Sequence, residues 1–448
     1  MAVPNLILGA GLTGLSCAYH LSDPDRYRLM ERDAAVGGLA KTRSRPGGFL
    51  CDGTGHWLHL RTEYARSMVH TLLGGNISPR QRRARVFSNG VFTAYPFQAN
   101  TYGLPAAVVS ECLLGFIRAY QLEDRREPAN YLEWIRQEFG EGICRHFMEP
   151  YNRKIYGVPL DTLASNFAAK YIPRPSIESV VNGALGLSPE LLGYNASFVY
   201  PTNGGIGALA ESMHEHILRK AERGREAVAI DLQKKHATMD DGERIRFEHL
   251  VSTIPLPDLV TLCLRGNPTA VPANVVEMSS LLRANSVLYY DIGIRGEPKP
   301  HQDYHWIYLP EPSFPFYRIG SYSAVERNLA PAGHRSYYVE LGYVGEVDPS
   351  KFVEPVLRGL RELGILEDEN DVLFMVPNIL SPAYVLFDQH YEIARKTVLS
   401  WLTRTGVISV GRYGRWQYNA MEDALLEGKE AAEIVRGDRP LEEELCPK

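Results

Sequence analysis

The stretch PNLILGAGLTG, residues 4–14, decides the fold of this chain. Its apolar start has no net period, as in a strand buried on both faces, and a helical pattern of apolar residues opens directly after it. Gly9 allows the tight turn, Gly11 lets the backbone approach a pyrophosphate, and Gly14 lets the helix pack against the strand. The helix would present its N–H groups and partial positive charge to that pyrophosphate, so this stretch predicts a dinucleotide site.

A second strand and a second glycine pair indicate which dinucleotide is bound. The strand at residues 27–30 ends in Glu31, about where an acidic side chain meets a ribose hydroxyl in such folds. Gly37 and Gly38 follow, and this order resembles the FAD signature of the glutathione-reductase-like flavoproteins, which NAD dehydrogenases usually lack. The alternative is that the Gly-Gly pair forms a surface turn.

Length and composition are those of an ordinary globular protein. The chain has 448 residues, 45% hydrophobic and 23% charged, and is long enough for two or three lobes. Because its net charge is −5, neither nucleic acid nor an anionic membrane is expected as a partner, and an anionic ligand would need local arginines.

Cysteine usage and hydropathy predict a cytoplasmic protein. The six cysteines are scattered and form no CxxC pair, so they are interpreted as reduced thiols, and no metal-ligand cluster is expected. The N-terminus lacks the basic region of a signal peptide, and no apolar run reaches the ~20 residues that span a bilayer.

These patterns predict an α/β fold built around a discontinuous, Rossmann-like FAD-binding domain. Later strands that could complete its sheet are expected at residues 227–230, 250–254 and 407–410. The predicted FAD-binding domain comprises residues 1–94, 198–255 and 405–437.

The other two predicted domains would bind the substrate. Residues 95–197 are expected to be mainly helical, with apolar side chains stepping by four from Tyr131 to Phe147 and a helix end before Pro150. Residues 256–404 would surround a mixed or antiparallel sheet, because side chains alternate in strand fashion over 284–345.

Three glycine-containing turns complete this picture. Asn89-Gly90 between apolar pairs predicts a β-hairpin. His56 follows a strand in a glycine turn, where it could approach a flat ligand or simply be satisfied within the turn. The glycines at 204–207 lack a clean preceding parallel strand and a terminal acid, so they are interpreted as a turn under the flavin domain, not as a second nucleotide site.

Several segments outside the cofactor signature carry a further pattern. They are FLCDGTGHW (49–57), AYPFQAN (94–100), FMEPYNRKIYGVP (147–159), GYNASFVYPTNGGIG (193–207), YLPEPSFPFYR (308–318), SPAYV (381–385) and GRYGRWQY (411–418). With them, nearly all of residues 5–435 resembles the UDP-galactopyranose mutase family, within the amine-oxidase-like FAD flavoproteins. The likeness is nearer the eukaryotic-type branch, or a bacterial relative that acts on a related nucleotide sugar.

This resemblance implies a redox-neutral flavoenzyme, an isomerase that interconverts UDP-galactopyranose and UDP-galactofuranose or a closely related UDP-sugar. N5 of reduced FAD would attack the anomeric carbon and displace the diphosphate, and NAD(P)H or another reductant would supply the reduced form. The protein's part would be to position the substrate, stabilise the departing diphosphate and exclude water.

The resemblance also implies the residues of the site. The catalytic residues would be His56, Asn195, Arg318, Tyr384 and Tyr418. The UDP-sugar would contact Tyr95, Phe97, Gln98, Phe147, Asn152, Tyr156, Arg174, Asn195, Tyr308, Arg318, Tyr322, Tyr384 and Tyr418. FAD would contact Gly9, Gly11, Leu12, Thr13, Gly14, Glu31, Arg32, Gly38, Leu39, Gly55, His56, Val228, Thr253, Gly411, Arg412, Tyr418 and Met421. Without the resemblance, the aromatic residues among these would be interpreted as core.

Two departures from the family pattern bear on the substrate. Where members commonly carry a second substrate arginine, this chain has Tyr171, with Arg174 three residues on. Where relatives place Asp or Asn near sugar and flavin, it has residues 419–423, which include Ala420. The sugar, the reductant and the oligomeric state therefore stay open, a homodimer being one option. The alternatives are an oxidase or desaturase of the protoporphyrinogen or amine oxidase class, and a non-catalytic FAD-binding module.

Overall fold

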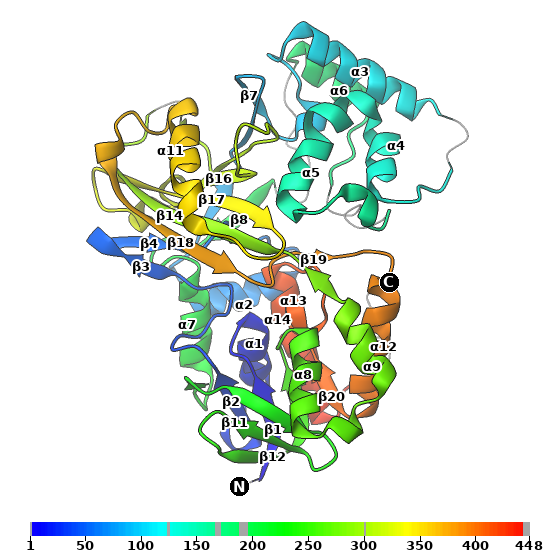
Figure 1. Ribbon diagram of the computed structural model, residues 1–448. Coiled ribbons are helices and arrows are strands. Elements are labelled where there is room, and N and C mark those ends of the chain that lie inside the picture. Colours follow the sequence, from blue (N-terminus) through cyan, green and yellow to red (C-terminus); the bar gives the residue numbers. More distant parts are fainter. Residues whose placement is uncertain (1, 123–125, 166–171, 188–195, 300–301, 442–448) are drawn as a thin grey trace.

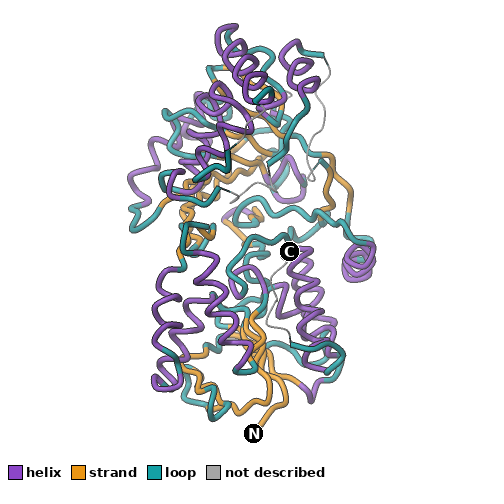
Figure 2. The backbone as a smooth tube through the Cα atoms, turned by 90° about the vertical axis from the view of Figure 1, so that its right-hand side faces the viewer, coloured by secondary structure: helices purple, strands orange, loops and turns teal. Residues whose placement is uncertain are grey.

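The computed structural model describes residues 2–122, 126–165, 172–187, 196–299 and 302–441. Asn195, Tyr171 and Cys446, which figure in the predictions above, lie outside these residues. Figure 1 shows a lower part with the first sheet and its covering helices, a second sheet above it, and a group of helices at the top. The same three levels follow one another from bottom to top in the side view of Figure 2.

The first sheet surrounds the N-terminal strand. Its strand order is β10-β11-β12-β1-β2-β9, and β20 also pairs with β12. The strands are β1 (Ala2–Leu8), β2 (Tyr27–Glu31), β9 (Glu222–Arg223), β10 (Ala227–Asp231), β11 (His236–Met239), β12 (Arg244–Ser252) and β20 (Val407–Ser409). Since β1 runs parallel to both β2 and β12 and lies between them, Leu6 and Ile7 are fully buried. The α/β fold class is thereby confirmed, as are the three later strands.

Helices cover this sheet (Figure 1). They are α1 (Leu12–Leu21), α2 (Glu63–Leu73), α7 (Gly207–His216), α8 (Leu256–Gly266), α9 (Ala273–Leu281), α12 (Tyr391–Arg404), α13 (Gly411–Gly414) and α14 (Met421–Arg436). The first and last of them, α1 and α14, pack so closely that a Cβ on Gly428 would lie 2.3 Å from the Thr13 carbonyl oxygen. Two helices from opposite ends of the chain therefore pack directly on each other.

The second sheet has the order β18-β14-β17-β16-β15-β6-β7, and every pair is antiparallel except β15 with β6. Its strands are β6 (Ala84–Ser88), β7 (Val91–Ala94), β14 (Ser286–Arg295), β15 (Trp306–Tyr308), β16 (Arg318–Ser321), β17 (His334–Tyr343) and β18 (Val372–Leu380). Short strand pairs flank the two sheets: β3 (Arg43–Arg45) with β4 (Phe49–Cys51), β5 (Ser78–Gln81) with β8 (Ser197–Tyr200), and β13 (Arg283–Ala284) with β19 (Val385–Leu386). Helices α10 (Tyr322–Val325) and α11 (Val353–Glu362) belong to this part of the chain.

The hairpin at Asn89-Gly90 corrects one part of the predicted domain division. The hairpin itself is confirmed, with φ of +52° and +76° at the two turn residues. Residues 84–94 were assigned to the FAD-binding domain, but β6 and β7 join the second sheet because β6 pairs with β15, more than 200 residues away in the sequence. Such a long-range pairing leaves no local signal. The domain division as a whole stays a prediction.

The upper helices differ from the single long stripe expected over residues 131–147. The helices are α3 (Ala106–Tyr120), α4 (Tyr131–Ile143), α5 (Glu149–Tyr156) and α6 (Ile177–Leu185). Gly140, with φ of +76°, kinks α4, and a short π-helical segment then leads directly into α5. The expected helix end before Pro150 was wrong, because Pro150 lies in the first turn of α5, where a missing N–H costs no hydrogen bond. None of the described helices is long and apolar enough to cross a membrane.

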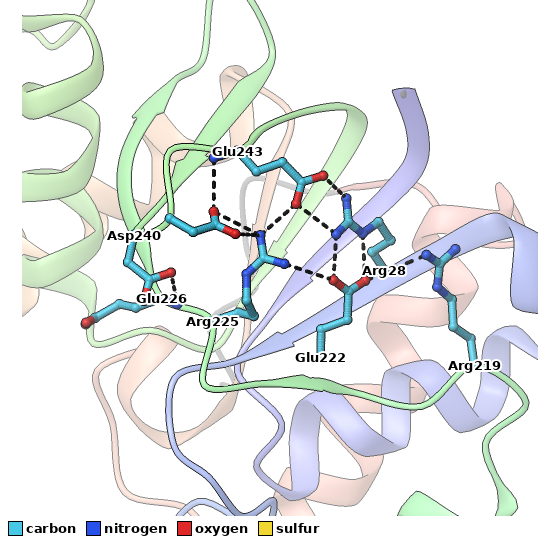
Figure 3. A network of polar contacts seen from close by, with 8 residues as sticks. Arg28, Arg219, Glu222, Arg225, Glu226, Asp240 and Glu243 are labelled. Atoms are coloured by element: carbon cyan, nitrogen blue, oxygen red, sulfur yellow. Dashed lines mark hydrogen bonds and ion pairs between the residues drawn. The ribbon is translucent and has the colours of Figure 1, made fainter.

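An ion-pair network ties β2 to the edge of the first sheet (Figure 3). Arg28 pairs with Glu222 at 2.6 Å and with Glu243 at 2.8 Å, and Arg225 reaches the same Glu243 at 2.6 Å. Hydrogen bonds from the two guanidinium groups lower the pKa of Glu243 to about 2. The network therefore joins β2 to β9 through Glu222 and to the turn before β12 through Glu243.

We expect this network to make part of the stability pH-dependent. Glu243 has a lower pKa folded than unfolded, so its stabilising contribution is present above about pH 4.5 and is lost as the pH falls towards 2. Urea unfolding of wild type and Glu243→Gln should differ most at pH 6.5 and less at pH 3.5. Glu248→Gln, an exposed change on the same strand β12, is the control. A difference that grows on acidification would contradict the assignment.

Candidate active site

The turn after β1 has the geometry that its glycines predict. Gly9 has φ of +99°, and a Cβ there would lie 2.1 Å from Oγ1 of Thr253, whose hydroxyl donates to the Leu8 carbonyl at 3.0 Å. A Cβ on Gly14 would lie 1.9 Å from the Gly9 carbonyl oxygen. Both positions exclude a side chain because strand, turn and helix pack directly on one another.

Gly11 differs, because no protein atom crowds it. A Cβ there would reach its nearest neighbour, Cα of Gly38, at 3.7 Å, which is an ordinary contact. Gly37 N–H donates to the Ala10 carbonyl at 2.8 Å, so the second glycine pair lies against the first turn and is not an isolated surface turn. Leu39 follows this pair, and Leu12 and Thr13 open α1 beside it. The two glycine segments form a narrow backbone surface at the N-terminus of α1.

Glu31 is held next to this surface. Its carboxylate accepts hydrogen bonds from the backbone N–H of Ala10 at 2.7 Å and of Asp33 at 2.9 Å, and it is buried. The neighbouring Arg32 side chain is exposed. Val228 has no partner in β11, since the β10–β11 register shifts between residues 227 and 229. The buried carboxylate of Glu31, predicted to meet the ribose, and the unpaired Val228 thus occur in the same sheet.

The segment around Gly411, near the C-terminus, lies against the start of α1. Gly411 has φ of +86°, its N–H donates to Glu427 at 2.6 Å, and a Cβ on it would lie 3.0 Å from Oγ1 of Thr13. Met421 opens α14, which packs on α1. Predicted FAD contacts from both ends of the chain are therefore close together in space.

His56 lies in a supported turn after β4. The preceding Asp52 is fully buried and accepts hydrogen bonds from Thr42, Tyr200 and the Ile206 N–H, and burial raises its pKa to about 6. Ile206 belongs to the glycine-rich turn at 204–207, consistent with the interpretation of that turn as a support. A Cβ on Gly55 would lie 2.6 Å from the Tyr338 hydroxyl, so Gly55 is packed against the second sheet.

We expect His56 to stay neutral near pH 7. Burial, together with the positive charge of Arg412, lowers the pKa of His56 to about 4. Because an unfolded histidine titrates near 6.5, this group favours unfolding as the pH falls below about 6.5. The NMR signals of its ring, assigned against His56→Gln, should not titrate between pH 8 and 5.5. A midpoint near 6.5 would show that the imidazole is solvated.

A cavity of about 320 Å³ adjoins this part of the structure, since Arg412, the neighbour of Gly411, lines it. Its walls come from the turn before α2, the segment after β7, helix α5, strand β15 and the residues around β19 and α13. The predicted residues that line it are Tyr95, Gln98, Phe147, Asn152, Tyr156, Tyr308, Tyr384, Arg412 and Tyr418. The lining residues that the sequence did not assign to the site are His59, Arg61, Met148, Tyr151, Ile155, Ile172 and Pro173. Asn419, Ala420 and Asp423, which also line it, belong to the segment 419–423 that departs from the family pattern. Tyr151 precedes the predicted Asn152, so the sequence could have indicated it as a lining residue. No motif near Arg61 indicated that residue.

One end of the cavity combines rings with side-chain amides. Gln98 donates to the Pro173 carbonyl at 2.9 Å, and its buried Oε1 has no hydrogen-bond partner among the described residues. Asn152 instead bonds within the protein, to the Met148 carbonyl at 2.6 Å. An unpaired buried acceptor is costly, so Gln98 Oε1 favours a ligand that donates a hydrogen bond there.

Arg412 supplies a cation at the other end. Its guanidinium lies over the rings of Tyr384, Tyr413 and Tyr418 at 5.9, 5.8 and 5.3 Å. It donates to the carbonyls of Ala383 and Asn419 at 3.3 and 3.2 Å. The Tyr418 hydroxyl donates to the Val385 carbonyl at 2.7 Å, so it is also held in place.

Four predicted substrate residues do not line this cavity. Phe97 is buried behind it and stacks on Phe147, with ring centroids 4.9 Å apart. The Tyr322 hydroxyl donates to buried Asp291 at 2.9 Å. Arg174 pairs with Glu138 at 3.4 Å. Arg318 is the fourth, and Asn195 lies outside the described residues.

Arg318 makes a two-point ion pair with Glu340. The residues face each other across β16 and β17, with Nη2 to Oε1 at 2.8 Å and Nε on Oε2. Burial opposes its charge, but Glu340 raises the pKa of Arg318 above its usual value. The guanidinium is therefore a fixed cation in a largely buried setting.

The two glycine segments, the buried carboxylate of Glu31 and the N-terminus of α1 have the arrangement of a dinucleotide-binding fold. Residues 12–436 match the family described as flavin containing amine oxidoreductase, and the chain belongs to that family. Its cofactor is FAD, which the uncrowded backbone at Gly11 fits. Among the described residues, no group of three or more His, Cys, Asp or Glu side chains could hold a metal ion.

Solved structures add detail. A reduced UDP-galactopyranose mutase superposes with a TM-score of 0.90 at 26% identity, over 98% of this chain and 95% of that one. A candidate protoporphyrinogen oxidase from Exiguobacterium sp. 255-15 follows with a TM-score of 0.71 and 16% identity, over 98% and 100%. Putrescine oxidase bound to putrescine has a TM-score of 0.63 and 14% identity, over 98% and 99%. The resemblance to the mutase family is thus confirmed, and the two oxidases share the fold.

Proposed function

We propose that this flavoenzyme interconverts the pyranose and furanose forms of a UDP-sugar, with UDP-galactose as the first candidate. One observation carries the proposal: a single cavity next to the FAD cradle collects residues of the AYPFQAN, PYN, SPAYV and GRYGRWQY segments. These segments are far apart in the sequence and lie outside the cofactor signature. The likeness to a reduced UDP-galactopyranose mutase supports the same reading.

The base of the nucleotide would occupy the end of the cavity with rings and amides. Gln98 Oε1 is placed to accept the N3–H of uracil, a donor that cytosine lacks. The rings of Tyr95 and Phe147 offer faces for stacking. Gln98 would thereby select uracil, and Asn152 would keep the wall rigid through its bond to α5.

The diphosphate would lie between cations and phenol groups. Arg412 lines the cavity directly, and Arg318 is oriented by Glu340 close to the same tyrosines, since both Tyr384 and Tyr308 interact with its charge. A guanidinium stabilises a departing diphosphate by charge, and the tyrosine hydroxyls add donors without adding charge.

When bound, reduced FAD would supply a nucleophilic N5 for the anomeric carbon. The protein's own residues would orient the sugar, hold the diphosphate for its return and exclude water with the tyrosines that line the cavity. His56, being neutral, would add no charge beside the flavin. Reduction would need NAD(P)H or another donor, and a cytoplasmic site of action would provide it.

The decisive test is anaerobic. Purified protein is reduced with dithionite and mixed with UDP-galactofuranose, and the products are separated by chromatography. UDP-galactopyranose should form with reduced enzyme and not with oxidised enzyme. Oxygen consumption with amines or porphyrinogens, with no sugar product under any condition, would favour the oxidase alternative instead.

A further inference from the structure

Arg61 and Asp423 form a charged pair on the wall of the cavity. Arg61 lies in the turn before α2, and Asp423 lies in the first turn of α14. Arg61 Nη2 donates to Asp423 Oδ1, and the two side chains are 53% and 33% exposed. Neither residue belongs to the motifs that indicated the substrate, and both reach the space where the substrate would lie.

A buried carboxylate fixes the orientation of this pair. Glu422 accepts hydrogen bonds from the N–H and Nε of Arg61, both at 2.8 Å, and from the N–H and hydroxyl of Thr62 at 2.7 and 2.6 Å. Burial raises the pKa of Glu422, but these hydrogen bonds outweigh it and lower the pKa overall. With four donors on its two oxygens, Glu422 anchors the turn to α14 and has little capacity left for a ligand.

The pair keeps donors and acceptors for a ligand. Within the described part of the chain, no residue accepts a hydrogen bond from Nη1 of Arg61. Asp423 receives one hydrogen bond on each oxygen, from Arg61 on Oδ1 and from the Ala420 N–H on Oδ2 at 2.7 Å. Since each carboxylate oxygen can accept two, donor and acceptor capacity remain next to each other.

The charge balance indicates which part of a nucleotide sugar fits here. The charge of Arg61 is matched by Asp423 and by the buried Glu422, so this wall has no positive excess and a diphosphate would meet the carboxylate of Asp423. A sugar hydroxyl is neutral and both gives and accepts hydrogen bonds, so adjacent hydroxyls can bond to carboxylate and guanidinium together. Arg412 instead donates to the carbonyl oxygens of Asn419 and Ala383, which leave its positive charge uncompensated, so it suits the diphosphate better.

We infer that Arg61 and Asp423 bind hydroxyl groups of the sugar and set which sugar nucleotide is accepted. The inference rests on the proposed function, because it needs a nucleotide sugar in this cavity. The inference assigns a role to residues 419–423, which depart from the family pattern. Asp423 would supply the carboxylate that binds the sugar, and Glu422 holds the turn before α2 on α14.

The test compares affinities for a nucleotide with and without its sugar. Oxidised, FAD-loaded protein is titrated calorimetrically with UDP, UDP-galactose, UDP-glucose and UDP-arabinose, and the sugar nucleotide that wild type binds most tightly serves as the probe. Asp423→Asn keeps an oxygen for capping α14, and Arg61→Lys keeps a charge for Glu422. Each should weaken the probe at least about tenfold and UDP less than about twofold.

The matched control is Arg153→Lys. Arg153 is a half-exposed arginine of α5 that pairs with Glu149 at 2.9 Å and does not line the cavity. It should leave both affinities unchanged. Melting temperature and the visible flavin spectrum verify that each variant is folded and loaded, and Asp423→Asn serves alone if Arg61→Lys fails to fold.

The outcomes separate this inference from the proposed function. Equal weakening of UDP and of the probe would place the pair at the diphosphate, and unchanged affinities would remove it from the site; either result overturns the inference alone. Wild type that binds no UDP compound would overturn the proposed function and this inference with it.

Discussion

Gly11→Val is expected to yield a folded protein that contains no flavin. A Cβ at Gly11 meets no protein atom closer than 3.7 Å, so we expect the substitution to leave the apoprotein folded. The new methyl groups would instead occupy the backbone surface that the pyrophosphate of FAD must approach. We expect an FAD content below about a tenth of wild type, measured from the visible spectrum after purification, with little change in far-UV circular dichroism.

Two further glycines serve as controls for this result. Gly75→Val is an exposed change with nothing within 4 Å, and it should keep its flavin. Gly14→Val should lose both flavin and stability, because its Cβ would lie 1.9 Å from the Gly9 carbonyl. A yellow, fully loaded Gly11→Val protein would refute the role of this turn.

Replacing Arg318 is expected to reduce turnover much more than FAD content. Loss of a charged hydrogen bond to the diphosphate corresponds to ~1.5–3 kcal/mol, or about 10- to 150-fold in kcat/KM. The single variant Arg318→Met has a second consequence, since it leaves the buried carboxylate of Glu340 without its partner. That loss costs about 3–5 kcal/mol in comparable buried pairs, so the variant should also melt earlier.

A double variant separates the two effects. Arg318→Met with Glu340→Gln removes both charges and should recover most of the melting temperature while turnover stays low. Glu340→Gln alone should keep Arg318 charged and lose its orientation, raising KM. Full recovery of turnover in the double variant would show that Arg318 acts through stability alone and does not touch the substrate.

Much of the FAD half could be predicted from the sequence. The turn at Gly9, the close packing at Gly14 and the meeting of Gly11 with the second glycine pair all occur as the spacing indicated. These interactions join residues that are near in the chain, and at Gly9 and Gly14 the surrounding protein leaves room for glycine only. A local motif therefore carries enough information to specify them.

The helical part was predicted less well for a physical reason. The stripe from Tyr131 to Phe147 is buried as expected, yet Gly140 breaks the helix and Pro150 begins the next one. Apolar periodicity reports which side chains face a core, and it passes through a kink without change. Proline is compatible with a helix start as well as with a helix end.

The partners of the charged residues were decided by the tertiary structure alone. Arg318 and Glu340 meet through the register of two strands, Tyr322 finds Asp291, and Arg174 turns to Glu138. Arg61 and Asp423, separated by 362 residues, come together only because α14 packs beside α1. The sequence by itself determined the fold, the cofactor and the family resemblance, since these rest on short-range steric patterns. Which side chains share the cavity wall depends on long-range packing, which no local pattern records.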